Sequence, residues 1–128
     1  MSEPVRVIPF ERVRMRDLAQ VGGKNASLGE MIGELASAGI RVPGGFATTA
    51  DAFREFLEYN ELRPRIEHAL ASLDVSDVRA LTDAGRTIRS WVAAAKLPPK
   101  LIEDVERHYR TLVGDDDRAS FAVRSSAT

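Results

Sequence analysis

The chain has 128 residues, of which 44% are hydrophobic and 29% are charged, and its formal net charge is −1. This length suits one domain with a modest core, and the lack of a basic excess argues against a nucleic-acid partner. The sequence has no cysteine, which excludes disulfides, thiolate metal ligands and a cysteine nucleophile. No signal peptide or membrane-spanning run is evident, so we expect a cytoplasmic protein with no membrane partner.

The first third of the chain predicts a short strand and a long helix. Residues 4–10 alternate loosely between apolar and polar side chains, which indicates a strand ending near Pro9. A helix is predicted from about residue 24 to residue 38, with Gly39 placed to end it. Its predicted core-facing stripe consists of Leu28, Met31, Ile32 and Leu35.

Two glycines and a lysine stand where this helix should begin, in residues 21–31 (VGGKNASLGEM). Gly22 and Gly23 allow a tight turn and a close approach to a ligand. A helix start offers unpaired N–H groups and a positive dipole end, and Lys24 adds a mobile charge. The pattern indicates a phosphate cradle, although the Walker A spacing is absent. A glycine-rich turn with a solvated lysine is the alternative.

The middle of the chain predicts a short strand at residues 46–48 and four further helices. Thr48 and Asp51 are expected to form a capping box that opens the next helix. Ser76 is the predicted N-cap of a later helix that ends before Pro98. The apolar side chains expected to face inward on the four helices are Phe53, Phe56 and Leu57; Leu62, Ile66, Leu70 and Leu73; Val78, Leu81, Ile88 and Val92; and Leu101, Val105, Tyr109 and Leu112.

The C-terminal residues predict a solvated acidic turn at residues 114–117 and a strand at residues 121–124. A lone strand cannot pair its own backbone groups, so we expect the chain to be a piece of a larger protein. The guanidinium of Arg124 is suited to phosphate oxygens, and Ser125, Ser126 and Thr128 can add hydroxyl or backbone donors beside it. The predicted fold class is therefore α+β, predominantly helical with a few short strands.

Other polar or aromatic residues predict structural roles. His68 and His108 lack a partner at ligand or triad spacing, so no catalytic or metal-binding residue is expected in this chain. Arg86 follows Asp83 by three residues, which favours a local ion pair. Trp91 is expected to anchor packing at the edge of its helix.

Three blocks together resemble a known family: residues 21–31, residues 42–57 (VPGGFATTADAFREFL) and residues 121–128 (FAVRSSAT). Their order and spacing are similar to the N-terminal nucleotide-binding domain of the phosphoenolpyruvate synthase (pyruvate, water dikinase) family. The wider group includes pyruvate phosphate dikinase and rifampicin phosphotransferase. The resemblance implies that residues 1–128 form part of an ATP-grasp-type ATP-binding domain, with the phosphohistidine and pyruvate-binding domains absent.

The resemblance also implies a site and a reaction. Lys24 and Arg124 would contact the ATP phosphates, together with Gly22, Gly23 and Ser125. The full enzyme would use Mg-ATP, with the Mg²⁺ ligands outside this chain, to phosphorylate a histidine. Pyruvate, ATP and water would then give phosphoenolpyruvate, AMP and phosphate.

On this interpretation the 128 residues alone would be inactive, and their partners would be ATP and the remaining domains of a homodimeric parent. Three alternatives stay open at this stage. They are a rifampicin phosphotransferase fragment, a pyruvate phosphate dikinase fragment and a non-catalytic helical interaction module.

Overall fold

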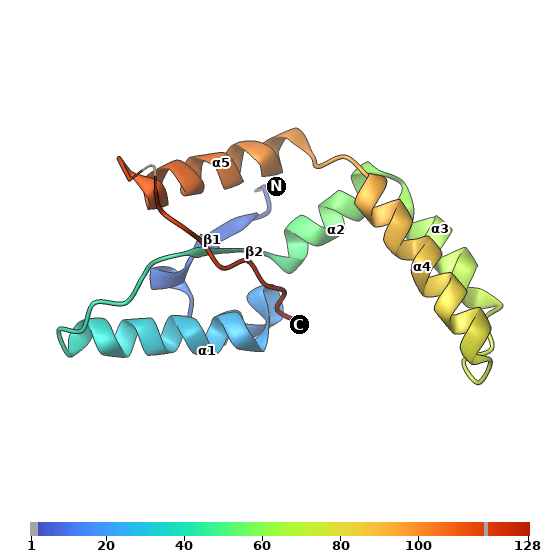
Figure 1. Ribbon diagram of the computed structural model, residues 1–128, viewed down its shortest axis with the longest axis horizontal. Coiled ribbons are helices and arrows are strands. Elements are labelled where there is room, and N and C mark those ends of the chain that lie inside the picture. Colours follow the sequence, from blue (N-terminus) through green and yellow to red (C-terminus); the bar gives the residue numbers. More distant parts are fainter. Residues whose placement is uncertain (1–2, 117) are drawn as a thin grey trace. The chain divides into compact units, whose positions relative to one another are not determined.

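A computed structural model describes residues 3–116 and 118–128. The chain divides into two compact units, residues 1–53 with 99–128, and residues 54–98. The elements labelled in Figure 1, with two short 3-10 turns (η1, η2), are β1 (Val7–Pro9), η1 (Phe10–Arg12), η2 (Met15–Asp17), α1 (Leu18–Ser37), β2 (Phe46–Thr48), α2 (Ala50–Tyr59), α3 (Leu62–Ala71), α4 (Val78–Ala94) and α5 (Pro99–Val113). The predominantly helical α+β fold class is confirmed.

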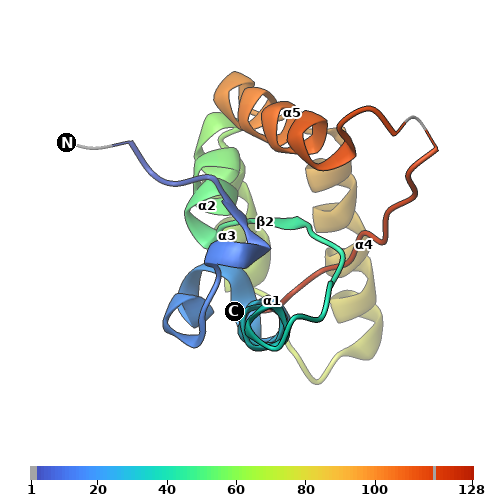
Figure 2. The ribbon, with the colours of Figure 1, turned by 90° about the vertical axis from the view of Figure 1, so that its left-hand side faces the viewer.

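The first unit is built around a two-stranded antiparallel sheet. Val7 pairs with Thr48, and Pro9 pairs with Phe46. β2 covers residues 46–48 as predicted, whereas β1 covers only Val7–Pro9 of the strand predicted at residues 4–10. Helices α1 and α5 lie on opposite sides of these strands, as Figures 1 and 2 show from two directions.

Helix α1 is broken at Gly22, which has φ 80° and ψ 166°. The predicted start near residue 24 therefore matches the helix after the break, while one further turn precedes it from Leu18. The end is confirmed: Gly39 has φ 79° and donates its N–H to the Ala36 carbonyl at 3.1 Å. The Ile40 N–H reaches the Leu35 carbonyl at 2.8 Å, which completes a Schellman motif.

The buried face of α1 agrees with the predicted stripe only at Ile32, which is buried as expected. Its buried residues are Val21, Gly22, Ala26, Gly29 and Ile32. Met31 is 46% exposed, and Leu28 and Leu35 are only half-buried. The helix packs too closely on Val13 for large side chains to intervene, since a β-carbon on Gly29 would lie 2.4 Å from the Val13 carbonyl oxygen. Hydrophobic periodicity favours the larger side chains, whereas this close approach selects the small ones.

Both predicted caps are displaced by one residue. Thr49, not Thr48, caps α2, and its Oγ1 accepts the Ala52 N–H at 3.1 Å. Thr48 is the last residue of β2 and pairs with Val7 instead. Helix α4 is capped by Asp77, whose carboxylate accepts the Ala80 N–H at 3.1 Å.

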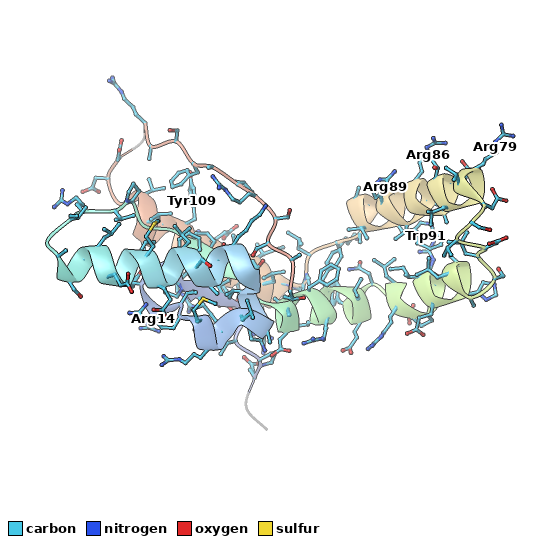
Figure 3. The ribbon with its side chains drawn as sticks, turned by 90° about the horizontal axis from the view of Figure 1, so that it is seen from below. Arg14, Arg79, Arg86, Arg89, Trp91 and Tyr109 are labelled. Carbon is cyan, nitrogen blue, oxygen red and sulfur yellow. The ribbon has the colours of Figure 1, made fainter. Side chains whose placement is uncertain are left out.

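The second unit contains the packed helices α3 and α4. Leu62 is buried at the start of α3, and Trp91 lies between the two helices in Figure 3. The Arg65 guanidinium lies 4.3 Å from the Trp91 ring centroid, so the expected anchoring role of this tryptophan is confirmed.

Several predicted core positions are wrong, because helices with few neighbours leave part of each apolar stripe in solvent. The exposed members are Phe53, Leu70, Val78, Leu81 and Tyr109. Leu73 lies beyond the end of α3.

The predicted strand at residues 121–124 is also wrong, because this segment has no partner strand and contains neither helix nor strand. Val123 is 95% exposed, and the Phe121 ring lies 5.4 Å from that of Tyr109. In the predicted acidic turn, Asp115 and Asp116 are exposed as expected. Asp117 lies outside the described residues.

Candidate functional site

The break at Gly22 creates a new helix start inside α1. The left-handed φ of 80° at this position favours glycine over other residues. Because the regular helix begins again after Gly22, the N–H groups of the next residues lie at a positive dipole end. Lys24 is exposed at this helix start, where the sequence predicts a phosphate-binding lysine.

The C-terminal segment is bound at this same helix start. The Gly23 N–H donates to the Ala127 carbonyl oxygen at 3.3 Å, and the Asn25 N–H donates to Ser126 Oγ at 3.4 Å. In Figures 1 and 2 the C-terminus lies beside the N-terminal part of α1. The structure thus brings together two blocks that are about a hundred residues apart in the sequence.

The predicted site residues all lie in or next to this contact. Lys24 stands between the two N–H donors, and Arg124 is two residues before Ser126, a Cα separation of at most about 7.6 Å. Ser125 lies between Arg124 and Ser126 in the sequence. Lys24, Arg124 and Ser125 are all exposed. Within the described residues, neither cationic side chain makes an ion pair or a side-chain hydrogen bond.

The geometry changes the expected role of the backbone. The sequence suggests that the N–H groups at the helix start face a phosphate, but those of Gly23 and Asn25 are hydrogen-bonded to Ala127 and Ser126. These two backbone donors are therefore already used within the chain. The sequence indicates Ser126 only as one of several donors beside Arg124, and its contact with the Asn25 N–H is not predicted by any local pattern.

Side-chain hydrogen bonds also stabilise α1 around the break at Gly22. Gln20 Nε2 donates to Asp51 Oδ2 at 3.0 Å, and the Asp51 N–H donates to Gln20 Oε1 at 3.3 Å. This double contact joins the first turn of α1 to the start of α2. Asn25 Nδ2 also donates across the break to the Val21 carbonyl at 2.9 Å.

Other polar groups have structural surroundings. His68 is exposed, while the Nδ1 of His108 lies 2.7 Å from the Asp104 carbonyl oxygen and its ring is 5.7 Å from that of Phe46. The expected ion pair between Arg86 and Asp83 is confirmed at 3.6 Å. Figure 3 shows Arg86 on the side of α4 that faces away from α3.

A hollow of about 390 Å³ beside β1 and α5 is lined by charged residues of both signs. Its ion pairs include Arg6 with Glu3 at 3.6 Å and Arg107 with Asp104 at 3.0 Å.

Among the described residues no group of three or more potential metal ligands occurs. No described helix combines the length and apolar character needed to cross a bilayer.

Comparison with known families gives the class of this protein. Residues 18–128 match the model of the pyruvate phosphate dikinase AMP/ATP-binding domain family, and the chain belongs to this family. The matched region includes the glycine–lysine block and the arginine block that meet at the Gly22 break.

Individual relatives narrow the resemblance to phosphoenolpyruvate synthase. The chain is 50% identical over 122 residues to the phosphoenolpyruvate synthase of Pseudomonas aeruginosa (strain UCBPP-PA14), covering 95% of this chain and 15% of that protein. It is 53% identical over 124 residues to the one from Neisseria meningitidis serogroup B, covering 95% and 16%. It is 48% identical over 127 residues to the one from Escherichia coli (strain K12), covering 99% and 16%.

The chain therefore spans about a sixth of the length of these curated relatives. The predicted membership of the phosphoenolpyruvate synthase family is confirmed. The rifampicin phosphotransferase, phosphate-dependent dikinase and interaction-module alternatives are not favoured.

Proposed function

We propose that this chain is the part of a phosphoenolpyruvate synthase that binds the phosphates of ATP through Lys24 and Arg124. The family description supports a nucleotide-binding role, and the names of the relatives support the assignment to a phosphoenolpyruvate synthase. The observation that carries the assignment to these residues is the hydrogen bonding of residues 126 and 127 on either side of Lys24. Lys24 and Arg124 thereby belong to two chain segments that are distant in the sequence and bound to each other in the fold.

The two cations would act in different ways on a triphosphate. Arg124 presents a planar fork that can bind two phosphate oxygens, and Lys24 is a compact charge on a flexible stem. Both remain positively charged at neutral pH. Positive charge placed around the phosphates stabilises the charge that develops during phosphoryl transfer. Gly22 makes room for residues 126 and 127 beside Lys24, Gly23 adds no side chain next to Lys24, and Ser125 supplies a further hydroxyl.

The complete reaction would need groups beyond this chain. A histidine in another domain would accept the phosphoryl group, and pyruvate, ATP and water would become phosphoenolpyruvate, AMP and phosphate. Because the described residues contain no acidic cluster suited to a metal, Mg²⁺ ligands would come from ATP and the rest of an ATP-grasp-type domain. We also propose a cytoplasmic, homodimeric parent without nucleic-acid or membrane partners.

The test uses the full-length protein that contains this chain. Lys24→Ala and Arg124→Ala should each cost about 2–4 kcal/mol in the ATP-dependent phosphorylation of the enzyme, a thirty- to several-hundred-fold loss. Transfer from phosphorylated enzyme to pyruvate should be unchanged. Lys96→Ala and Arg118→Ala, which remove exposed cations elsewhere, serve as controls. Normal ATP-dependent phosphorylation in both test variants would show that the phosphate assignment is wrong.

A further inference from the structure

We infer that Ser126 is a positioning residue, whose hydroxyl holds Arg124 in place beside Lys24. This inference rests on the proposed function, because it assigns to Ser126 the task of orienting a phosphate-binding arginine. It also separates two adjacent serines that look equivalent in the sequence. Ser125 is part of the proposed phosphate site, whereas Ser126 binds the protein itself.

The first observation is the burial of Ser126. Of residues 120–128, Ser126 is the one with intermediate burial, and the others are exposed. Its Oγ accepts the Asn25 N–H at 3.4 Å, whereas the Ser125 hydroxyl makes no hydrogen bond within the described residues. The neighbouring Ala127 carbonyl accepts the Gly23 N–H at 3.3 Å, so two successive residues are bound at one helix start.

The second observation is the fit against Gly22. A β-carbon built on Gly22 would lie 2.3 Å from Ser126 Oγ, 2.5 Å from the Ala127 carbonyl oxygen and 2.8 Å from the Ser126 carbonyl oxygen. Only a residue without a side chain leaves room for this segment. Gly22 therefore leaves space for Ser126 and also creates a new helix start in α1.

The third observation concerns the segment around Arg124. It has neither helix nor strand to fix it, but it is held on both sides. Three residues before Arg124, the Phe121 ring packs against Tyr109 with centroids 5.4 Å apart. Two residues after it, Ser126 binds the helix start. Without the second contact Arg124 would keep its charge but lose its fixed position. The entropy cost of ordering Arg124 when a phosphate binds would then weaken its contribution to phosphate binding.

The experiment is a double-mutant cycle in the full-length protein, with the KM for ATP and kcat as readouts. Ser126→Ala should raise the KM for ATP about five- to thirty-fold and leave the KM for pyruvate unchanged. In an Arg124→Ala background the same substitution should change the KM for ATP less than two-fold, because the residue that it positions is gone. Ser120→Ala, at an exposed serine of the same segment, is the matched control and should have no effect.

Hydrogen exchange provides a readout that is independent of activity. Ser126→Ala should increase amide exchange in the peptide covering residues 21–31, where the Gly23 and Asn25 N–H groups lie, and Ser120→Ala should not. An unchanged exchange rate in Ser126→Ala would overturn the inference.

The kinetic outcomes separate this inference from the proposed function. If Arg124→Ala weakens ATP use and Ser126→Ala does not, the positioning role is wrong and the phosphate site stands. If Ser126→Ala weakens ATP use equally in both backgrounds, its role is general stability, and the inference is again overturned. If Arg124→Ala has no effect, the proposed function fails and the inference falls with it.

Discussion

Gly22 and Ser126 approach each other so closely that a β-carbon on Gly22 would lie 2.3 Å from Ser126 Oγ. The two residues belong to the first and last of the blocks that resemble the family. Their contact gives the glycine a purpose beyond its left-handed φ of 80°, because the missing side chain also makes room for the segment that carries Arg124.

The two neighbouring glycines should respond differently to alanine. Gly22→Ala should destabilise the first unit, because it adds a strained positive φ and a clash with Ser126 and Ala127, together costing about 2–4 kcal/mol. Gly23→Ala should preserve or slightly raise stability, since its β-carbon would meet only Leu18 Cδ1 at 3.8 Å. Urea unfolding of both variants measures the difference. Equal stabilities would contradict the contact at Gly22.

Two adjacent threonines test the observed cap of α2. Thr49 is 3% exposed; its Oγ1 accepts the Ala52 N–H at 3.1 Å and donates to the Val5 carbonyl at 2.6 Å. Thr49→Ala should therefore lower the free energy of unfolding by about 1–3 kcal/mol. Thr48→Ala, at an exposed strand position, should change it by less than about 0.5 kcal/mol. A larger effect at Thr48 in urea unfolding would favour the cap predicted from sequence.

Much of the fold could be predicted because its signals are local. The glycine end of α1 and the two short strands depend on residues that are close in the sequence. The predicted caps of α2 and α4 are each one residue from the observed ones. For α2, Thr48 and Thr49 have the same capping chemistry, and tertiary contacts distinguish them: Thr48 pairs with Val7, whereas Thr49 donates to the Val5 carbonyl. The predicted buried face of α1 contains larger side chains than the observed face, because the close approach of Val13 to Gly29 is a tertiary contact that local periodicity does not encode.

The residues of the candidate site could be predicted from the sequence, but the hydrogen bonds that bring them together could not. A glycine–lysine block and an arginine block could be selected from their chemistry and family resemblance. The hydrogen bonds of Ser126 and Ala127 with the N–H groups of Asn25 and Gly23 could not be predicted. No local sequence pattern encodes a contact between segments about a hundred residues apart. The strand predicted at residues 121–124 failed for the same reason: alternation indicates a strand, but only a partner strand can form one.

The exposed turn before α4 makes a testable pH effect. Hydrogen bonds from the Ser76 hydroxyl and then the Ser76 N–H lower the pKa of Asp74 below its ordinary value of 3.8. The ionised carboxylate therefore favours the folded state above the unfolded pKa, and this contribution is lost as pH falls through the lower folded pKa. A carboxyl NMR titration should place Asp74 below 3.8 in the wild type and closer to it in Ser76→Ala. The same pKa in both proteins would contradict the role of Ser76.

Two helix glycines with different neighbours test how tightly α1 packs. A β-carbon on Gly29 would lie 2.4 Å from the Val13 carbonyl oxygen and 2.7 Å from Val13 Cβ, and Val13 is fully buried. Gly29→Ala should therefore force the helix away from the core and lower the free energy of unfolding by about 1–3 kcal/mol.

Gly85→Ala is the matched substitution in α4, where the new methyl group would meet only the mobile end of Arg89 at 3.1 Å. Because alanine restricts the unfolded chain and favours helix, this variant should gain about 0.5–1 kcal/mol. Urea unfolding with unchanged m-values measures both effects. If Gly29→Ala were as well tolerated as Gly85→Ala, α1 would not be in close contact with Val13, and the small-residue face would need another explanation.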